Sequence, residues 1–176
     1  MSRDLKIIDS NIALLSKDFH VDPEVCNNPG HYETYLQQGA LIDYKKGIGV
    51  TYVMVENDKK IVGYVTVKAA SLITDGGESH KIGYPAIEIS ELAVDKDYRG
   101  QGIGYELVES AIAIGLLLNE NYLGVQYLVL CADRNAVAFY EKPRLGLRKL
   151  DEISDVPRED WNMDCVPMYK KIVVLL

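Results

Sequence analysis

Hydrophobic and polar positions along the chain follow two periods, and each period predicts one kind of element. Short runs rich in β-branched and aromatic residues predict strands at residues 4–8, 51–56, 61–73, 84–94, 127–132, 145–150 and 166–174. Apolar residues that recur every three to four positions predict helices at residues 10–17, 31–44, 102–119 and 134–141. The order β-α-α-β-β-β-α-β-α-β-β predicts a mixed sheet with helices on both faces.

Three of these segments carry more detail. The polar turn from Asn57 to Lys60 joins two strand-like runs and predicts an antiparallel hairpin. Residues 127–132 are apolar throughout, which predicts a central strand buried on both faces. Gly39 weakens the helix predicted at residues 31–44, or divides it.

Length and composition are those of one globular domain. The chain has 176 residues, 48% apolar and 26% charged, so we expect a single domain over residues 1–176. No apolar run approaches the roughly 18–20 residues of a membrane-spanning helix, and the charged N-terminal residues differ from a signal peptide. We therefore expect a cytoplasmic protein with no membrane partner. The net charge of −7 argues against a broad nucleic-acid-binding surface.

Cysteine and histidine residues indicate neither a metal centre nor a disulfide framework. Cys26, Cys131 and Cys165 lie far apart, and no Cys-x-x-Cys pair or Cys/His cluster occurs. Cys131 falls in the apolar run of residues 127–132, so we expect it to be buried as a small hydrophobic residue.

The most informative stretch is residues 87–104, IEISELAVDKDYRGQGIG. A strand rich in β-branched residues leads through turn residues into RGQGIG, which opens an apolar helix. Backbone N–H groups and the positive end of the helix dipole meet at such a turn and bind anions, most often phosphate. The spacing differs from a P-loop, because no Lys-Ser or Lys-Thr follows, and from Gly-x-Gly-x-x-Gly. A glycine-rich loop that binds nothing is the alternative interpretation.

A second motif, CADRNAVAFYEK, spans residues 131–142. Asp133 follows the apolar strand and is a typical N-cap for a short helix. That helix carries Ala136, Phe139 and Tyr140, and Gly146-Leu147 follows. The motif is therefore again a strand that leads into a helix.

Together the two motifs resemble the signatures of the GNAT superfamily of N-acetyltransferases, over roughly residues 51–150. The resemblance implies an α/β (α+β) fold with a mixed, mostly antiparallel central sheet, splayed central strands and helices on both faces. It implies acetyl-CoA as the cosubstrate and no metal. Residues 51–150 would form the cofactor-binding core, and the N-terminal helices in residues 1–50 would lie over the acceptor site.

The resemblance also implies contacts to the cosubstrate, residue by residue. The backbone of the strand end would pair with the pantetheine arm through Leu92, Ala93 and Val94. The glycine-rich turn would wrap the pyrophosphate through Arg99, Gly100, Gln101, Gly102, Ile103 and Gly104. The second motif would contribute Asp133, Asn135, Phe139 and Tyr140. Asp133 stands where the family usually has asparagine, and the segment from Tyr140 to Gly146 is longer than usual.

Direct acetyl transfer needs a base for the amine proton and an acid for the departing thiolate. Tyr140 matches the tyrosine that serves as the acid in the family; a packed aromatic residue is the alternative. Glu88 falls where histone acetyltransferases of the superfamily carry their base, and Glu91 and ordered water are the other candidates. Both glutamates lie in a strand that reads as buried, and burial raises the pKa of a carboxyl group.

The resemblance implies an N-acetyltransferase that modifies a primary amine of a small molecule, peptide or protein. One alternative is a non-catalytic acyl-CoA-binding sensor. Another is toxin-like acetylation of aminoacyl-tRNA, because the chain is also similar to the acetyltransferase toxins of toxin–antitoxin pairs. The basic residues that could then meet RNA phosphates are Lys142, Arg144, Arg148 and Lys149. The acidic net charge counts against nucleic acid, and Glu91 replaces a residue that is often arginine in those toxins.

The acceptor pocket is expected from the segments with the least pattern, residues 19–49, 74–83 and 151–164. Relatives often dimerise through their C-terminal strands, so a homodimer is expected beside the amine-bearing acceptor.

Overall fold

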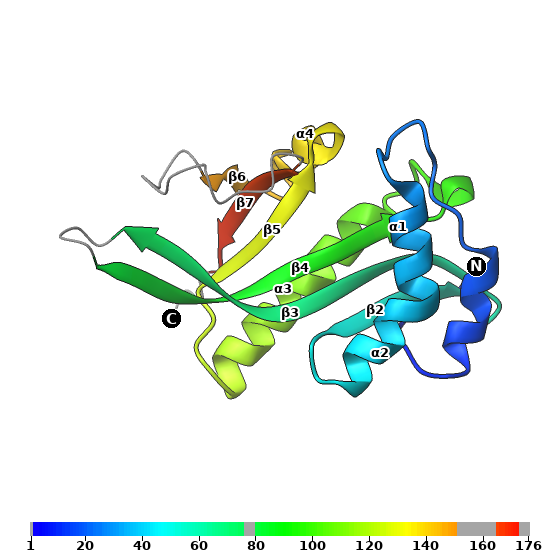
Figure 1. Ribbon diagram of the computed structural model, residues 1–176, viewed down its shortest axis with the longest axis horizontal. Helices are drawn as coiled ribbons and strands as arrows, with labels where there is room; N and C mark the ends of the chain where they lie inside the picture. Colours follow the sequence, from blue (N-terminus) through cyan, green and yellow to red (C-terminus); the bar gives the residue numbers. More distant parts are fainter. Residues whose placement is uncertain (1, 76–79, 151–164, 173–176) are drawn as a thin grey trace. The chain divides into compact units, whose positions relative to one another are not determined.

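The computed structural model of the protein describes residues 2–75, 80–150 and 165–172 (Figure 1). The chain consists of two compact units. The first comprises residues 1–68 and 89–111, and the second comprises residues 69–88 and 112–176. Two strands and one helix contribute residues to both units. The acidic segment at residues 151–164, expected to line the acceptor pocket, lies outside the described residues.

The described strands form one sheet in the order β1-β2-β3-β4-β5-β7-β6. Strand β2 pairs antiparallel with β1 and β3, and β7 pairs antiparallel with β5 and β6. The strands are β1 (Arg3–Ile7), β2 (Val50–Glu56), β3 (Lys60–Asp75), β4 (Lys81–Val94), β5 (Tyr127–Asp133), β6 (Arg148–Lys149) and β7 (Cys165–Lys171).

The helices fall between these strands in the predicted order. They are the 3-10 helix η1 (Ile12–Asp18), α1 (Pro29–Thr34), the π-helix η2 (Tyr35–Gly39), α2 (Ala40–Lys45), the 3-10 helix η3 (Lys96–Tyr98), α3 (Ile103–Asn121), the 3-10 helix η4 (Arg134–Ala136) and α4 (Val137–Tyr140). The predicted fold class, a mixed and mostly antiparallel sheet with helices, is confirmed.

The helix predicted at residues 31–44 is one helical stretch made of α1, η2 and α2. It begins at Pro29, where a missing N–H is tolerated, and the side chain of Asn28 accepts a hydrogen bond from the His31 backbone N–H. Gly39 is the last residue of the π-helical turn. A Cβ at this position would lie 2.7 Å from the Tyr35 ring, so glycine lets the ring pack against the helix.

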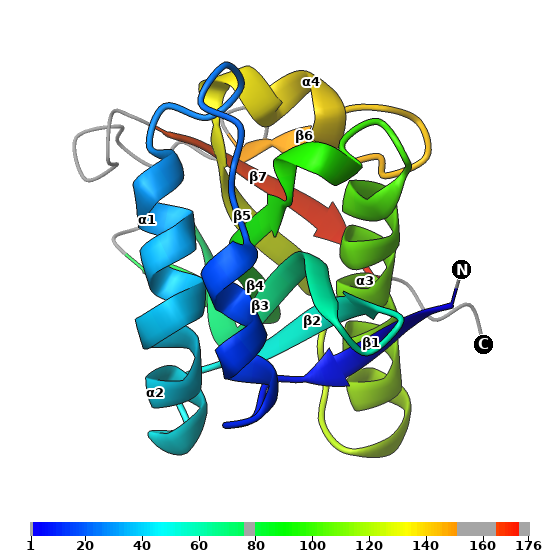
Figure 2. The ribbon, with the colours of Figure 1, turned by 90° about the vertical axis from the view of Figure 1, so that its right-hand side faces the viewer.

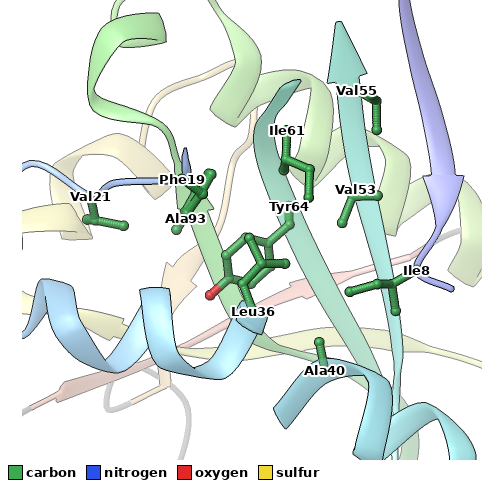
Figure 3. Packing of buried hydrophobic residues seen from close by; sticks show 10 residues of the cluster. All are labelled: Ile8, Phe19, Val21, Leu36, Ala40, Val53, Val55, Ile61, Tyr64 and Ala93. Carbon is green, nitrogen blue, oxygen red and sulfur yellow. The ribbon is translucent and has the colours of Figure 1, made fainter. Parts of the chain in front are cut away.

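In the first unit, α1 and α2 lie on one face of β2 and β3, and the first half of α3 lies on the other (Figure 2). The ring of Tyr64 points from β3 into the cluster of buried residues beneath the helices (Figure 3). Its centroid lies 5.6 Å from the Phe19 ring and 6.3 Å from the Tyr35 ring. The Tyr64 hydroxyl donates a hydrogen bond of 2.9 Å to the Tyr32 carbonyl, so this buried polar atom is satisfied.

The predicted hairpin at Asn57 joins β2 to β3. Asn57 and Asp58 adopt φ angles of 50° and 59°, which asparagine and aspartate tolerate better than most residues. The Lys59 N–H donates to the Glu56 carbonyl at 3.0 Å and closes the turn.

In the second unit, burial alternates along β5, and the prediction of a strand buried on both faces is wrong. Leu128, Leu130 and Ala132 are buried, whereas Cys131 is exposed. The apolar run was a misleading signal because tyrosine, valine and cysteine are also stable on a half-covered face. Strand β6 is shorter than predicted, because Gly146 adopts a φ of 63° just before it.

A disulfide links Cys131 on β5 to Cys165 on β7, with a Cα–Cα distance of 5.5 Å. Two sequence-based expectations are therefore wrong: Cys131 is not a buried small hydrophobic residue, and a disulfide forms where the cysteine spacing indicated no disulfide framework. The antiparallel register of β5 and β7 brings the two residues together from positions 34 residues apart. The spacing of the cysteines in the sequence does not predict that register.

Candidate active site

The site in the first unit is built around Asp95, which follows β4 directly. Its side chain is 1% exposed and accepts hydrogen bonds from the backbone N–H groups of His20 (3.2 Å) and Asp97 (3.1 Å). The Lys60 ammonium lies 3.3 Å from the same carboxylate. The Asp95 N–H donates to the Val62 carbonyl at 3.0 Å. These contacts hold the end of β4 and the start of the glycine-rich turn in one place.

The glycine-rich turn follows as predicted. Gly100 and Gly102 adopt φ angles of 73° and 84°, a conformation that side chains with a Cβ disfavour. The first helical N–H donors of α3 are Tyr105 and Glu106, both bonded to the Gly102 carbonyl. The backbone N–H groups of residues 102–104 thus precede the helical ladder, at the positive end of a 19-residue helix. Their place suits an anionic group.

Two side chains of the turn bond within the first unit. The Arg99 guanidinium forms an ion pair with Asp22, and the Gln101 side-chain oxygen accepts a hydrogen bond of 2.6 Å from Arg3. Both residues are exposed. These partners hold the outer side of the turn, a role that the sequence motif did not indicate.

The strand end predicted to meet the pantetheine arm packs closely on β3. A Cβ built on Gly63 would lie 3.2 Å from the Ala93 carbonyl oxygen and 2.9 Å from the Ile103 side chain. Ala93 is buried, and Leu92 and Val94 are half-buried. Only glycine at position 63 lets the strand and the start of α3 approach β3 so closely.

Glu91 directly precedes Leu92 on β4 and contacts His31 of α1. Its two carboxylate oxygens each lie 3.1 Å from the His31 Nε2 atom, and the side chain is 14% exposed. Burial raises the pKa of Glu91 above its ordinary value, and the charges of His31 and Lys68 act in the opposite direction. Glu91 is thus mostly covered and not fully buried, and the sequence analysis did not recognise His31 as its partner.

A second ion pair joins Lys68 on β3 to Asp43 on α2. The Lys68 ammonium lies 3.2 Å from the Asp43 carboxylate, to which the Tyr35 hydroxyl also donates, at 3.1 Å. Burial raises the pKa of Tyr35, so its hydroxyl stays protonated at neutral pH.

The second motif lies in the second unit. The Asp133 carboxylate accepts a hydrogen bond of 3.1 Å from the Asn135 N–H, which confirms its predicted place at the start of a helix. Tyr140 is 7% exposed, and its ring lies 5.0 Å from that of Phe139 in an edge-to-face arrangement. The Tyr140 carbonyl accepts from the Leu147 N–H at 3.1 Å, which closes the longer segment after the tyrosine. Glu88 also belongs to this unit and is half-buried.

The second unit contains a hollow of about 440 Å³ with a cationic lining. The strand register pairs Tyr127 with Lys171 and Arg148 with Tyr169, so these four side chains share one face of the sheet. The basic sheet face, as we name it, consists of Tyr127, Arg148, Tyr169 and Lys171. Lys170 also borders the hollow, but its side chain alternates to the other face of β7, and its ammonium donates to the Leu145 carbonyl. Among the lining residues that belong to the described part of the chain, none is acidic.

Of the predicted basic run, only Arg148 lines this hollow. Lys149 instead forms an ion pair with Glu141, at 3.4 Å. The sequence analysis missed Lys171, because a local pattern does not encode its register opposite Tyr127. It also missed Lys170, which pairs with Leu128 and borders the same hollow.

Within residues 2–75, 80–150 and 165–172, no group of three or more His, Cys, Asp or Glu side chains has the geometry of a metal site. In the same residues no helix is both long and apolar enough to cross a membrane.

Comparison with protein families identifies one match. The model of the acetyltransferase (GNAT) family matches residues 13–146, which include both motifs.

Comparison with solved structures finds similar folds at low sequence identity. A tyrosine-to-phenylalanine mutant of the AtaT toxin, bound to the C-terminus of the antitoxin AtaR and to acetyl-CoA, matches with a TM-score of 0.72 and 15% identity, over 98% of this chain and 94% of that one. AtaT complexed with acetyl-methionyl-tRNAfMet matches with a TM-score of 0.73 and 17% identity, over 94% of each chain. A tyrosine-to-phenylalanine mutant of KacT matches with a TM-score of 0.74 and 16% identity, over 98% of this chain and 96% of that one.

Proposed function

We propose that this chain, which belongs to the acetyltransferase (GNAT) family, transfers the acetyl group of acetyl-CoA directly to a primary amine of a small molecule, peptide or protein. The observation that carries the proposal is the glycine-rich turn between β4 and α3. Two glycines at positive φ and a row of backbone N–H groups lie at the start of a long helix, as a pyrophosphate requires.

The cosubstrate supplies an activated thioester, and the chain positions it. Backbone N–H groups of Gly102, Ile103 and Gly104 would bind the pyrophosphate, with Gly100 providing the turn. The Arg99 guanidinium, now paired with Asp22, would turn toward the phosphates, because a doubly charged pyrophosphate outcompetes one carboxylate. The backbone of residues 92–94 would pair with the amides of the pantetheine arm. Asp133, Asn135 and Phe139 would complete the contacts from the second motif.

Two proton transfers accompany the reaction. The amine nitrogen forms a bond to the thioester carbon, the carbon–sulfur bond breaks, and its electron pair leaves on sulfur. Tyr140 donates its hydroxyl proton to that thiolate. The amine proton goes to Glu88, Glu91 or water, and the raised pKa of Glu91 favours it as an acceptor near neutral pH.

The test measures CoA release from acetyl-CoA with polyamines, amino acids and peptides as acceptors. Tyr140→Phe should lower kcat at least tenfold and leave the affinity for acetyl-CoA within about twofold, because one acid group typically contributes 10²–10⁴-fold. The matched control is Tyr122→Phe, since Tyr122 is 75% exposed. Equal rates for the two variants would exclude Tyr140 as the acid. Binding of acetyl-CoA without release of CoA would indicate an acyl-CoA sensor.

The basic sheet face favours aminoacyl-tRNA as a second candidate acceptor. Two cationic side chains, Arg148 and Lys171, lie on one sheet face with two tyrosine rings, in a chain whose net charge is −7. Cationic side chains bind phosphates, and an aromatic ring stacks on an unpaired base such as those at a tRNA 3′ end. Tyr127 is half-buried and is the ring that could stack, because Tyr169 is only 6% exposed.

This candidate predicts CoA release with bulk aminoacyl-tRNA and loss of that activity in the double variant Arg148→Gln, Lys171→Gln. The loss should appear in KM, and the dependence of KM on salt should weaken because fewer phosphates are contacted. Lys17→Gln, Lys59→Gln is the control, since it removes the same charge from exposed positions in the first unit. Equal KM values for the two double variants would exclude the basic sheet face as an RNA site.

A further inference from the structure

His31 and Glu91 form a pair that the family motifs do not contain. His31 is the third residue of α1, and Glu91 lies on β4, sixty positions further along the chain. Nε2 of His31 is 3.1 Å from each carboxylate oxygen. The Glu91 side chain is 14% exposed and that of His31 is 50% exposed. The imidazole therefore stands between a mostly buried carboxylate and solvent.

The local structure holds the imidazole in this position. Asn28 accepts a hydrogen bond from the His31 N–H and starts α1 on the residue after it. The His31 ring meets the Tyr32 ring edge to face, with centroids 5.2 Å apart. The ring contact with Tyr32 and the helix start leave the Nε2 atom directed at Glu91.

The other charged and titratable groups near Glu91 are already engaged. Lys68 on β3 is paired with Asp43 on α2, and the Tyr64 hydroxyl on β3 donates to the Tyr32 carbonyl. Lys68 lowers the pKa of Glu91, and Asp43 raises it. Within the described residues, His31 is the group that lies within hydrogen-bond distance of the Glu91 carboxylate.

An ion pair that only joins a helix to a strand would not need one partner to be mostly buried and the other to be half exposed. Neutral imidazole exchanges protons with carboxylic acids and with water near neutral pH, which no other side chain does at its ordinary pKa. A half-exposed imidazole in contact with a buried carboxylate can therefore return a proton to solvent after each turnover.

We propose that His31 and Glu91 form a proton relay, in which the Glu91 carboxylate takes the proton of the acceptor amine and His31 passes it to solvent. The inference rests on the proposed acetyl transfer and selects Glu91 from the open candidates for the base. The amine loses one proton as its bond to carbon forms. That proton converts the Glu91 carboxylate to the acid, moves to the imidazole, and leaves to water, so the pair is restored. His31 is a positioning residue that acts through Glu91.

The test is the pH dependence of kcat and KM for wild-type protein, Glu91→Gln and His31→Gln, with the acceptor amine identified by CoA release. Glu91→Gln should lower kcat about 100-fold and make kcat rise with hydroxide concentration. His31→Gln should lower kcat at least tenfold near pH 7, with less effect at high pH, where hydroxide accepts the proton from Glu91. Imidazole in the buffer should restore at least half of the activity of His31→Ala.

The chain offers a matched control in a second histidine–glutamate pair. His20 Nδ1 lies 3.6 Å from the Glu33 carboxylate, and the histidine is 51% exposed. His20→Gln should leave the pH profile unchanged, and imidazole should have no effect on it.

A structural ion pair would give a different set of results. His31→Gln would then lower thermal stability or raise KM, with a pH profile of the same shape as wild type and no rescue by imidazole. That outcome overturns the relay and leaves acetyl transfer intact. Inactive wild-type protein with every amine would instead overturn the proposed function. If the His31 variants fail to fold, Glu91→Gln decides, because it keeps the size of the side chain and removes the proton acceptor: a kcat within twofold of wild type would overturn the relay.

Discussion

At the scale of single residues, two buried carboxyl groups of the first unit have opposite surroundings. Asp95 receives two backbone N–H groups and an ammonium, so its negative charge is compensated. The Glu91 carboxylate contacts the imidazole of His31, and burial raises the pKa of Glu91. A carboxylate of the first kind holds structure together, and one of the second kind can accept a proton.

Loss of the Asp95 carboxylate should destabilise the protein. Asp95→Ala leaves two backbone donors unbonded and Lys60 with one fewer partner, so the free energy of unfolding should fall by about 3 kcal/mol. The measurement is urea denaturation at pH 7. Asp97→Ala is the control, because Asp97 also lies 3.3 Å from Lys60 but is 63% exposed. If Asp97→Ala lowered the free energy of unfolding as much as Asp95→Ala, the ion pair with Lys60, and not the hydrogen bonds of the buried turn, would be what stabilises the protein.

The raised pKa of Glu91 predicts a pH-dependent stability. A carboxyl group whose folded pKa is raised stabilises the fold below its unfolded pKa, and that contribution is lost as pH rises through the folded pKa. Wild-type protein should therefore lose stability relative to Glu91→Gln between pH 4 and pH 7. Paired urea titrations at the two pH values measure the difference. A gain for wild type over this range would mean that His31 dominates over burial.

At the scale of elements, β3 and α3 meet so closely that only glycine fits at position 63. A Cβ there would lie 2.9 Å from Ile103, 3.0 Å from Leu107 and 3.2 Å from the Ala93 carbonyl. The side chains belong to the helix that starts at the glycine-rich turn, and the carbonyl belongs to the strand before it. The spacing of these elements thus determines where the turn lies.

Gly63→Ala should therefore disturb both stability and cosubstrate binding. We expect a loss of about 1–3 kcal/mol, the usual cost of overpacking, with a weaker affinity for acetyl-CoA measured by calorimetry. Gly124→Ala is the control, since a Cβ at Gly124 meets no atom within 4 Å. Unchanged affinity in a folded Gly63→Ala variant would show that the turn tolerates a shift of β3.

At the scale of the whole molecule, the disulfide ties together strands that lie 34 residues apart in sequence. A reducing cytoplasm would keep Cys131 and Cys165 as thiols. The cytoplasmic location stays a prediction. Thiol labelling of freshly lysed cells would test it, because Cys131 and Cys165 react as thiols in a reducing compartment and are protected in the disulfide.

Cys131→Ser, Cys165→Ser should lower the free energy of unfolding of oxidised protein by about 3–4 kcal/mol, because closing a loop of this length restricts the unfolded chain. Cys26→Ser lies outside the disulfide and is the control. Reductant should abolish the difference between wild type and the double variant. A difference that persists in reductant would point to packing of the cysteine side chains.

The sequence by itself determined the order of elements, the hairpin, the glycine-rich turn and the two family motifs. Each depends on residues close together in the chain, where hydrophobic periodicity, turn chemistry and helix capping act. Asp133 as a helix start and Gly100 and Gly102 as turn residues are of this kind.

Tertiary structure alone decided which distant side chains meet. Asp95 was recognised only as a turn residue because its donors include His20 and Lys60, and His31 meets Glu91 across sixty positions. The disulfide and the basic sheet face follow from strand register, and the one-sided burial of β5 depends on which face is covered. Such contacts arise from packing and register, which a local pattern does not encode.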